Sequence, residues 1–349
     1  NKVTLADVAR ESNVSIMTVS RVVNARPGVG DATRKVVEAS IARLGYRPNI
    51  IAQGLKHKRS RTIGLIVPDV TNPYFPEIVR GAEDVAIRRD YTVLLTNVIE
   101  DVKREVKALE AFEDRQVDGV IACSPRLESD TLDGLLARHP AAVVVNRRTS
   151  PDIAGSVRID HERGSRLLAE HLLERGRTRF AFLRGPVNSE AGDDRHRGLI
   201  TALGRAGHDL RDDLCVACAP TIDAGERATQ ELLRRGTSFD AVVSFNDLVA
   251  AGAIRALLAS GRKVPDDVAV VGFDNIVFSS MFTPSLTTVD VPTYDLGQRA
   301  CSMLFDRMQG KSWGVDIVLQ PRLVVRTSTP SVGSEAPERR GRRPVIHRP

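Results

Sequence analysis

From residue 62 onward, short apolar runs alternate with amphipathic helical patterns, and this alternation restricts the chain to few folds. In the first half of this region the runs lie at 63–67, 92–95, 119–122 and 142–145, with helical patterns near 75–89, 101–115 and 129–138. Strands that alternate with helices form βαβ units, which build a doubly wound parallel sheet. We therefore predict such a sheet for this half.

The same alternation repeats in a second half. The apolar runs lie at 180–183, 241–244 and 268–272, with helical patterns near 161–175, 194–206, 224–235 and 246–260. Open parallel sheets bind ligands at the carboxyl ends of their strands. Two such halves side by side predict a ligand cleft between their strand ends.

The first sixty residues follow a different, all-helical pattern. Thr4, Ser15 and Asp31 are the expected N-caps of three helices, the second of which spans 16–24. The side chains expected to pack between these helices are Leu5, Val8, Ala9, Val19, Val22, Val23, Val36, Val37, Ile41 and Leu44. Two short helices joined by a tight turn predict a helix-turn-helix, whose second helix enters the major groove of DNA. The outward residues of that helix are Ile16, Met17, Ser20 and Arg21.

Positive charge is concentrated in this helical head. Residues 1–62 contain twelve Lys and Arg against four Asp and Glu, a net charge of +8, and residues 335–349 add +3. The whole chain has a formal net charge of +6, so residues 63–334 carry −5. A basic head on an acidic body indicates that polyanion binding belongs to the head.

The four cysteines, Cys123, Cys215, Cys218 and Cys301, are interpreted as small thiols in a reducing compartment. Cys215 and Cys218 have the spacing of a metal or redox pair, but no second pair and no nearby His completes a site. They lie in a predicted strand, where residues three apart point to opposite faces. We predict neither a metal site nor a cofactor.

Two further features predict a cytoplasmic protein. No apolar stretch approaches the roughly 18–20 residues that span a bilayer. The first residues, from Asn1 to Thr4, also lack the apolar run of a secretory signal.

Three stretches of the head carry a family resemblance. They are Val-Thr-Leu-Ala-Asp-Val-Ala at 3–9, Val-Ser-Ile-Met-Thr-Val-Ser-Arg-Val-Val-Asn at 14–24 and Leu-Gly-Tyr-Arg-Pro-Asn at 44–49. At these spacings the head resembles the DNA-binding domain of the lactose/galactose repressor (LacI/GalR) family of bacterial transcriptional regulators. The resemblance implies a regulator, in most members a repressor, that binds a palindromic DNA operator as a homodimer.

The resemblance also implies which head residues contact DNA. Arg21 would pair with a guanine, while Ile16 and Met17 would read bases through apolar contacts with thymine methyl groups. Packing within their own domain is the alternative role for Ile16 and Met17. The remaining head residues expected at phosphates or elsewhere on the DNA are Thr4, Ser15, Thr18, Ser20, Asn24, Thr33 and Tyr46.

Residues 48–61 match the family's hinge helix and linker, which fold on the operator. Leu55 corresponds to the leucine inserted into the minor groove, Ala52 would face its dimer mate, and Asn49 would contact DNA. Gly54 weakens a helix by roughly 1 kcal/mol relative to Ala, as suits a segment that orders only on DNA. An ordinary basic linker is the alternative.

The resemblance continues through the body to about residue 328, with landmarks at 72–75, 175–183, 245–253, 271–275 and 282–289. It implies an N-terminal all-α helix-turn-helix head plus an α/β periplasmic-binding-protein-like body of two doubly wound parallel-sheet subdomains. The expected boundaries are 1–47 for the head, 62–328 for the body and 329–349 for a disordered basic tail. Subdomain one would comprise about 62–159 and 291–324, and subdomain two about 160–290. The chain would cross between them three times, returning to subdomain one along 286–292.

The effector-binding residues that the resemblance implies are Asn72, Tyr74, Phe75, Asn146, Asp160, Arg195, Asn246 and Asp274. Carboxylate, amide and guanidinium groups around aromatic rings suit a polyhydroxylated ligand, because each hydroxyl both donates and accepts. Helix capping is the alternative role for Asn246 and Asp274.

Several positions depart from the family pattern. Pro220 stands where some members have an aromatic residue, Val291 where some have a polar ligand contact, and Asn146 replaces a more frequent aspartate. The effector is therefore not identified: a sugar or sugar derivative is the family default, and Arg184 and Arg195 leave an acidic sugar open.

The C-terminal residues 334–349 are rich in Arg, Pro and Gly and lack the leucine-rich helix with which some members form tetramers. This composition predicts a disordered tail and a dimer. The segment from Arg340 to Pro344 faintly resembles a minor-groove hook, a pattern that often occurs by chance.

Other functional classes fit less well. An enzyme is disfavoured because no P-loop, nucleophile elbow or His pair at metal-ligand spacing occurs, although His161 and His196 lie near predicted cleft loops. A sugar-binding receptor without regulatory DNA function would explain the body but not the head or hinge. An architectural DNA protein would not need the cleft.

Whether the effector induces or corepresses is left open, since cleft closure could separate paired hinges or bring them together.

Overall fold

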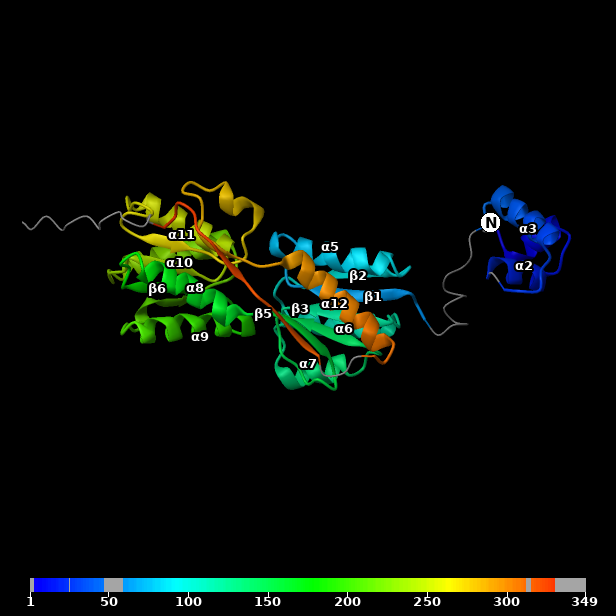
Figure 1. Ribbon diagram of the computed structural model, residues 1–349, viewed down its shortest axis with the longest axis horizontal. Coiled ribbons are helices and arrows are strands. Elements are labelled where there is room, and N and C mark those ends of the chain that lie inside the picture. Colours follow the sequence, from blue (N-terminus) through cyan, green and yellow to red (C-terminus); the bar gives the residue numbers. More distant parts are fainter. Residues whose placement is uncertain (1–2, 25, 47–58, 312–314, 330–349) are drawn as a thin grey trace, which may run out of the picture. The chain divides into compact units, whose positions relative to one another are not determined.

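The computed structural model describes residues 3–24, 26–46, 59–311 and 315–329 (Figure 1). The chain divides into two compact units, a head over Asn1–Ser60 and a body over Arg61–Pro349. The predicted hinge residues Asn49, Ala52 and Leu55, and the predicted tail from residue 330 onward, lie outside the described residues.

The head consists of three helices, α1 (Leu5–Glu11), α2 (Ile16–Val23) and α3 (Asp31–Leu44). Two of the predicted N-caps are confirmed. Thr4 and Asp7 form a reciprocal capping box at α1, and the Ser15 hydroxyl accepts a hydrogen bond from the backbone N–H of Thr18 at 3.1 Å. The buried core residues of the head are Val8, Ala9, Val19, Val22 and Val37.

Two expectations for the third helix are wrong. Gly30, not Asp31, is the N-cap of α3, and Asp31 is its first helical residue. Val36 is also half exposed, whereas its neighbour Val37 is fully buried. Successive helical residues point about 100° apart. Since Val37 and Ile41 already share the inward stripe, Val36 is turned to solvent.

The first sheet of the body has six parallel strands in the order β11-β5-β4-β3-β1-β2. The strands are β1 (Thr62–Val67), β2 (Thr92–Asn97), β3 (Gly119–Cys123), β4 (Ala142–Val145), β5 (Gly155–Ile159) and β11 (Asp316–Leu319). Helices α5 (Tyr74–Ile87) and α12 (Thr293–Met308) pack on one face, and α6 (Val102–Asp114) and α7 (Ser129–Leu136) pack on the other. Strand residues alternate between these two cores, so that Leu65 and Ile66 face opposite sides.

The second sheet has four parallel strands in the order β7-β6-β8-β9. The strands are β6 (Phe180–Arg184), β7 (Cys215–Ala217), β8 (Ala241–Ser244) and β9 (Ala269–Val271). Helices α8 (His161–Leu173) and α9 (Glu190–Arg205) cover one face, and α10 (Ile222–Arg234) and α11 (Asp247–Ala259) cover the other. The predicted fold class is confirmed: a helix-turn-helix is followed in the sequence by two doubly wound parallel sheets.

The chain crosses three times between the subdomains, as predicted. It leaves the first sheet after β5 to enter α8, returns through β10 (Thr288–Asp290) to α12, and leaves again from β11 to β12 (Arg322–Val324). β10 and β12 pair antiparallel, so two of the crossing segments form a short ribbon (Figure 1).

The chain after β12 belongs to the second subdomain. Thr329, expected to begin a disordered tail, is instead buried, and its hydroxyl lies 2.9 Å from Nε2 of His171 on α8. The short elements β5, β10, β11 and β12, together with α12, were not among the predicted elements.

Two glycines allow the close contact between α5 and α12, which lie side by side. A Cβ atom at Gly81 would overlap the carbonyl oxygen of Tyr294, and one at Gly297 would overlap that of Ile78. These backbone atoms belong to a neighbouring helix and cannot rotate away as a side chain can. The two helices could accommodate larger residues only by moving apart.

We expect Gly297→Ala to lower the free energy of unfolding by about 1–3 kcal/mol, because the added methyl group overpacks the helix contact. Gly134 on α7 is the matched control, since a Cβ there meets open space. Gly134→Ala should raise the free energy of unfolding by up to about 1 kcal/mol through helix propensity. Urea unfolding followed by circular dichroism measures both. Equal effects of the two substitutions would show that the α5–α12 contact is not tight.

Candidate functional site

The outward face of α2 presents two large apolar side chains to solvent. Ile16 is 53% exposed and Met17 is 66% exposed, although Val19 and Val22 of the same helix are buried. Arg21 is also exposed. Large apolar side chains that lie next to each other in solvent mark a surface that a partner can cover. The face is therefore available for contact with a macromolecule.

The polar residues predicted at DNA already take part in hydrogen bonds within the head. The hydroxyls of Ser15 and Thr18 lie 2.9 Å apart, and the side-chain amide of Asn24 donates to the backbone oxygen of Ser20 at 2.6 Å. Thr4 caps α1, while Thr33 and Tyr46 are half-buried. These contacts hold the polar groups in place beside the exposed apolar pair.

In the body, predicted effector residues gather at the carboxyl ends of strands. Asn72 follows β1, and its side-chain oxygen accepts a hydrogen bond from the backbone N–H of Tyr74 at 3.1 Å. Tyr74 and Phe75 open α5 with their rings edge to face at 5.1 Å. Asn146 follows β4. All four side chains are buried.

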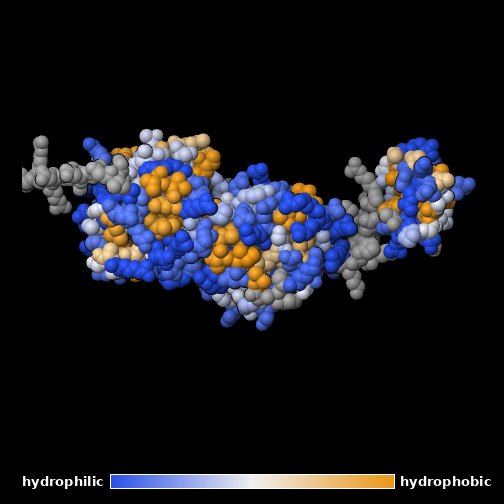
Figure 2. All heavy atoms as spheres, viewed as in Figure 1, coloured by the Kyte–Doolittle hydropathy of each residue, from blue (hydrophilic) through white to orange (hydrophobic). Residues whose placement is uncertain are grey.

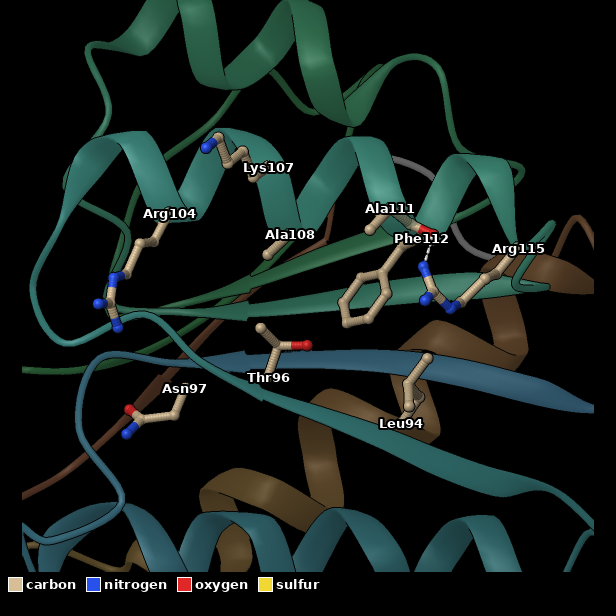
Figure 3. Close-up of a pocket in the computed structure, with 9 residues that line it drawn as sticks. All are labelled: Leu94, Thr96, Asn97, Arg104, Lys107, Ala108, Ala111, Phe112 and Arg115. Carbon is tan, nitrogen blue, oxygen red and sulfur yellow. Dashed lines mark hydrogen bonds between the residues drawn. The ribbon is translucent and has the colours of Figure 1, made fainter.

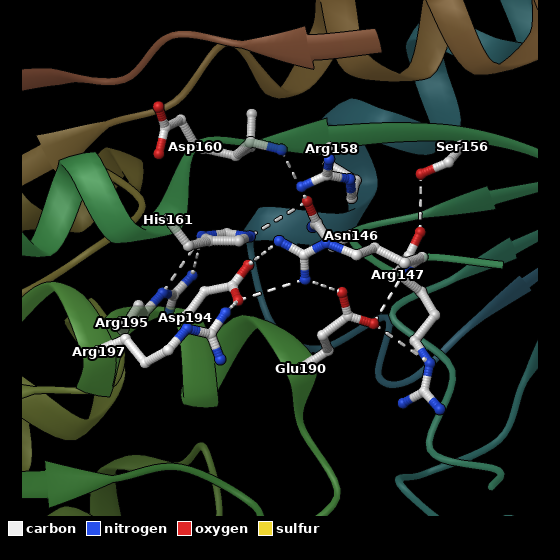
Figure 4. Close-up of polar contacts among 12 residues, drawn as sticks. Asn146, Arg147, Ser156, Arg158, Asp160, His161, Glu190, Asp194, Arg195 and Arg197 are labelled. Atoms are coloured by element: carbon white, nitrogen blue, oxygen red, sulfur yellow. Dashed lines mark hydrogen bonds and ion pairs between the residues drawn. The ribbon is translucent and has the colours of Figure 1, made fainter. Parts of the chain in front are cut away.

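A continuous chain of hydrogen bonds joins the two subdomains (Figure 4). Arg195 on α9 lies 3.4 Å from Nδ1 of His161, whose Nε2 lies 3.2 Å from the side-chain oxygen of Asn146. The amide nitrogen of Asn146 then donates to the Tyr74 hydroxyl at 2.7 Å. The structure thus brings together Tyr74, Asn146 and Arg195, three of the predicted residues, through His161, which was not among them.

Arg195 is a buried cation enclosed by aromatic rings. Its guanidinium carbon lies 3.8 Å from the Phe273 ring centre and 4.7 Å from that of Phe245. It donates to the backbone oxygen of Phe245 and reaches the carboxylate of Asp274 at 3.5 Å. Burial raises the pKa of Asp274 well above its usual range and lowers the pKa of Arg195. Both groups are therefore costly to keep charged without further partners.

Two further predicted residues, Asn246 and Asp160, serve as helix caps. Asn246 is the N-cap of α11, and its side-chain oxygen accepts from the N–H of Val249 at 2.9 Å. Asp160 caps α8 in the same way through Arg163. Asp274 is not a cap. Its φ of +113° lies outside the conformations that L residues favour, as does the +55° of Asn146, and such strain clusters at functional sites.

Ion pairs form a second link between the subdomains, one that the sequence analysis missed. Arg148, after β4, pairs with Glu190 and Asp194 at the start of α9, and its backbone N–H donates to Glu190 at 3.0 Å. Arg147 also lies 3.5 Å from Glu190, and Arg197 pairs with Asp194. No local sequence pattern pairs residues 42 positions apart, so only the fold reveals this contact.

A separate hollow of about 350 Å³ lies between α6 and the edge strand β2 (Figure 3). Its floor is apolar, with Leu94, Ala108 and Phe112, and its rim includes the cations of Arg104 and Arg115. It contains none of the predicted effector residues. At the predicted effector site, by contrast, Arg195, His161 and Asn146 bond to one another and link the two subdomains.

Two family descriptions match the chain. "Bacterial regulatory proteins, lacI family" matches residues 4–49, and "Periplasmic binding proteins and sugar binding domain of LacI family" matches residues 60–322. The chain belongs to the LacI family. The resemblance seen in the sequence is thereby confirmed, and the family consists of transcriptional regulators.

Relatives match this LacI-family chain over nearly its whole length. The HTH-type transcriptional regulator RegA of Clostridium saccharobutylicum is 38% identical over 93% of this chain and 98% of its own. The crystal structure of the lac repressor dimer bound to operator and the anti-inducer ONPF is similar with a TM-score of 0.86 and 31% identity, covering 95% of this chain and all of that one. A complex of the regulator CelR with cellobiose has a TM-score of 0.72 and 32% identity over 94% and 100% of the two chains.

The LacI-family body shows no feature of a metal or redox site in the described ranges. No group of three His, Cys, Asp or Glu side chains there could hold a metal ion. All four cysteines are free thiols, and Cys215 and Cys218 pack against different hydrophobic cores, on opposite faces of the sheet. Each helix in these ranges is too short or too polar to cross a membrane.

Asp247 is a buried charged residue with a structural role that the sequence analysis did not select. It is fully buried at the start of α11, where its carboxylate accepts from the N–H of Ile276 at 2.9 Å, the hydroxyl of Ser279 at 2.6 Å and the hydroxyl of Thr288. Thr288 begins the crossing strand β10. One carboxylate therefore fixes both a crossing segment and the short 3₁₀ helix η2 (Val277–Ser280). Burial raises its pKa from 3.8 to about 6.

We expect Asp247→Asn to remove a pH dependence of stability. Because the folded state binds the Asp247 proton more tightly than the unfolded chain does, the free energy of unfolding falls as pH rises from 3.8 to about 6. At most about 3 kcal/mol of stability is lost across this window through Asp247. The asparagine variant lacks that proton, whereas Asp274 titrates in both proteins. Urea unfolding of both proteins between pH 4 and pH 7 measures the difference, and parallel curves would contradict the assignment.

Proposed function

We propose that this chain is a sequence-specific transcriptional regulator, acting as a repressor, that binds a palindromic operator as a homodimer under the control of a small molecule. The observation that carries the proposal is the cleft network, in which Arg195, His161, Asn146 and Tyr74 link the two subdomains. A ligand that inserts among these groups changes the angle or distance between the subdomains. The protein then has two arrangements of its subdomains that differ in affinity for DNA, and the ligand shifts the balance by binding one arrangement more tightly than the other.

We assign base reading to the exposed face of α2. Arg21 pairs with a guanine, and Ile16 and Met17 contact thymine methyl groups in the major groove. The remaining residues of the proposed DNA interface are Thr4, Ser15, Thr18, Ser20, Asn24, Thr33, Tyr46, Asn49, Ala52 and Leu55. The head then spans 1–47, the hinge and linker 48–61, and the body begins at 62.

We propose a neutral polyhydroxylated effector, a sugar or sugar derivative. The two arginines that left an acidic sugar open both have carboxylate partners, Arg184 with Asp193 at 2.5 Å and Arg195 with Asp274. An anionic ligand would compete with these carboxylates, whereas hydroxyl groups can insert between donors and acceptors. The relative CelR is known with cellobiose, a neutral sugar. The proposed ligand contacts are Asn72, Tyr74, Phe75, Asn146, Asp160, Arg195, Asn246 and Asp274.

Exposed apolar residues on both subdomains suit a second copy of the chain. Subdomain one exposes Ile87, Leu95 and Ile99 around β2, the edge strand of the first sheet, and subdomain two exposes Val277, Phe278 and Met281 on and beside η2. Figure 2 shows hydrophobic patches on an otherwise largely hydrophilic body. Apolar patches on both subdomains and an open strand edge favour burial in a dimer. The solved lac repressor relative is a dimer on its operator.

We further propose that the protein has no enzymatic activity and acts in the cytoplasm on the bacterial nucleoid. Its family consists of transcriptional regulators, and its DNA partner is found there. No cofactor is required by the mechanism, because ligand binding alone supplies the free energy for the change in DNA affinity.

The test is fluorescence anisotropy of the full-length protein on DNA selected from a random pool, with and without a panel of sugars, sugar acids and nucleosides. A palindromic site that one neutral sugar releases supports induction, and tighter binding identifies a corepressor. A half-site duplex is the control for dimeric binding. No preference over random DNA at moderate salt would overturn the proposal and leave a sugar-binding receptor as the alternative.

We expect replacement of Ile16 and Met17 by Asn and Gln to change the preferred operator sequence. Loss of apolar contacts with thymine methyl groups should alter the ratio of affinities for competing sites by about tenfold or more. Val36→Gln is the matched control, because Val36 is an exposed valine on α3 outside the reading face. Selection from the same random pool measures the preference. An unchanged selected sequence would remove both residues as readers.

A further inference from the structure

His161 occupies the position at which the two subdomains share a hydrogen-bonded contact. It is the first residue of α8, two positions after the end of β5, and the residue is 2% exposed. Arg195 of the second subdomain approaches Nδ1 at 3.4 Å, and Asn146 of the first approaches Nε2 at 3.2 Å. Figure 4 shows the ring between these two side chains.

The partners fix the direction of this chain of hydrogen bonds. A guanidinium can only donate, so Nδ1 of His161 must be the unprotonated acceptor. The ring proton is then on Nε2 and is donated to Asn146 Oδ1. The same oxygen accepts from the backbone N–H of Ile159 at 3.3 Å. Two donors at one atom identify it as the amide oxygen, so the amide nitrogen faces Tyr74.

The charges around the ring are consistent with a neutral histidine. Arg195 from α9, Arg158 from β5 and Arg148 from the loop after β4 all contribute positive charge, and Asp274 lies beyond Arg195. Together with burial, these cations lower the pKa of His161 well below its usual range. The geometry and the charges therefore favour the same protonation state.

The chain ends at the hydroxyl of Tyr74. Because this oxygen accepts from Asn146 at 2.7 Å, its own proton remains to be donated. Tyr74 is buried, and the described residues provide no acceptor for that proton. A buried hydroxyl that keeps its proton without an acceptor is destabilising. An acceptor for this proton must therefore come from a bound molecule, either water or the effector.

We propose that His161 is a positioning residue that, together with the backbone N–H of Ile159, fixes the polarity of the chain and so makes the Tyr74 hydroxyl an obligate donor to the effector. This rests on the proposed function, in which the effector occupies this cleft. The effector then places an oxygen acceptor, such as a hydroxyl, ring ether or carbonyl oxygen, against Tyr74. A ligand with an ammonium group at that point is rejected, because two donors would face each other.

The first test needs no effector. Solid-state NMR of the full-length protein labelled with ¹⁵N-histidine distinguishes protonated from unprotonated ring nitrogens, and a His161→Gln sample assigns the signals. We expect His161 to carry its proton on Nε2 and to remain neutral between about pH 5 and pH 8, the range in which an unperturbed histidine changes its charge. A proton on Nδ1, or a ring that becomes charged within this range, would overturn the proposal even if operator binding is established.

The second test uses the panel sugar that releases the operator in the titration above. We expect His161→Leu to weaken binding of that sugar by about tenfold or more, and His161→Gln, whose amide can both donate and accept, by about threefold or less. In a Tyr74→Phe background, His161→Leu should cost little further, because both act on one contact. Additive losses would assign His161 a packing role only. If no panel sugar acts, the nitrogen spectra alone decide.

Discussion

The contacts in the cleft depend on the parallel alignment of strands in both sheets. Parallel strands bring all their carboxyl ends to one edge, and each end is followed by a loop free to present side chains. Asn72, Asn146 and Asp274 come from three different strand ends, and their positions follow from strand order rather than from their neighbours in sequence. The three crossings then hold the two edges toward each other, so that α9 and α8 contribute Arg195 and His161 to the same site.

In this arrangement charged groups are buried, and the loss of hydration raises the free energy of their charged forms. The pair of Arg195 and Asp274 meets at 3.5 Å, which is a long contact for two fully buried ions. Such a pair contributes little to stability, because desolvation offsets the Coulomb attraction. Its value lies in ligand recognition: groups that are incompletely satisfied in the protein gain most when hydroxyl groups of a ligand complete their hydrogen bonds. The aromatic rings of Phe245 and Phe273 hold the Arg195 guanidinium in position before a ligand binds.

Much of this could be predicted from the sequence, because apolar periodicity is local. The strands at 142–145 and 241–244 and the helix-turn-helix followed directly from it. The crossing strands did not, since β10 and β12 have only three residues each and depend on pairing with each other. Family motifs indicated Tyr74, Asn146 and Arg195. His161, Asp247 and the Arg148–Glu190 pair were not selected, because their roles arise from partners distant in sequence.

The order of the strands also has a consequence for the order of synthesis. β11, which pairs with β5, and α12, which packs against α5, are both made after all four strands of the second sheet. As the chain leaves the ribosome, the first sheet therefore waits with the outer edge of β5 unpaired and with the face beside α5 partly uncovered, while the second sheet can form from contiguous residues. The second sheet is encoded as an insertion that can fold early, and the first sheet is completed only when β11 has been made. In a nascent chain of this design, the unpaired edge of β5 and the uncovered part of that face are the regions most dependent on protection by chaperones.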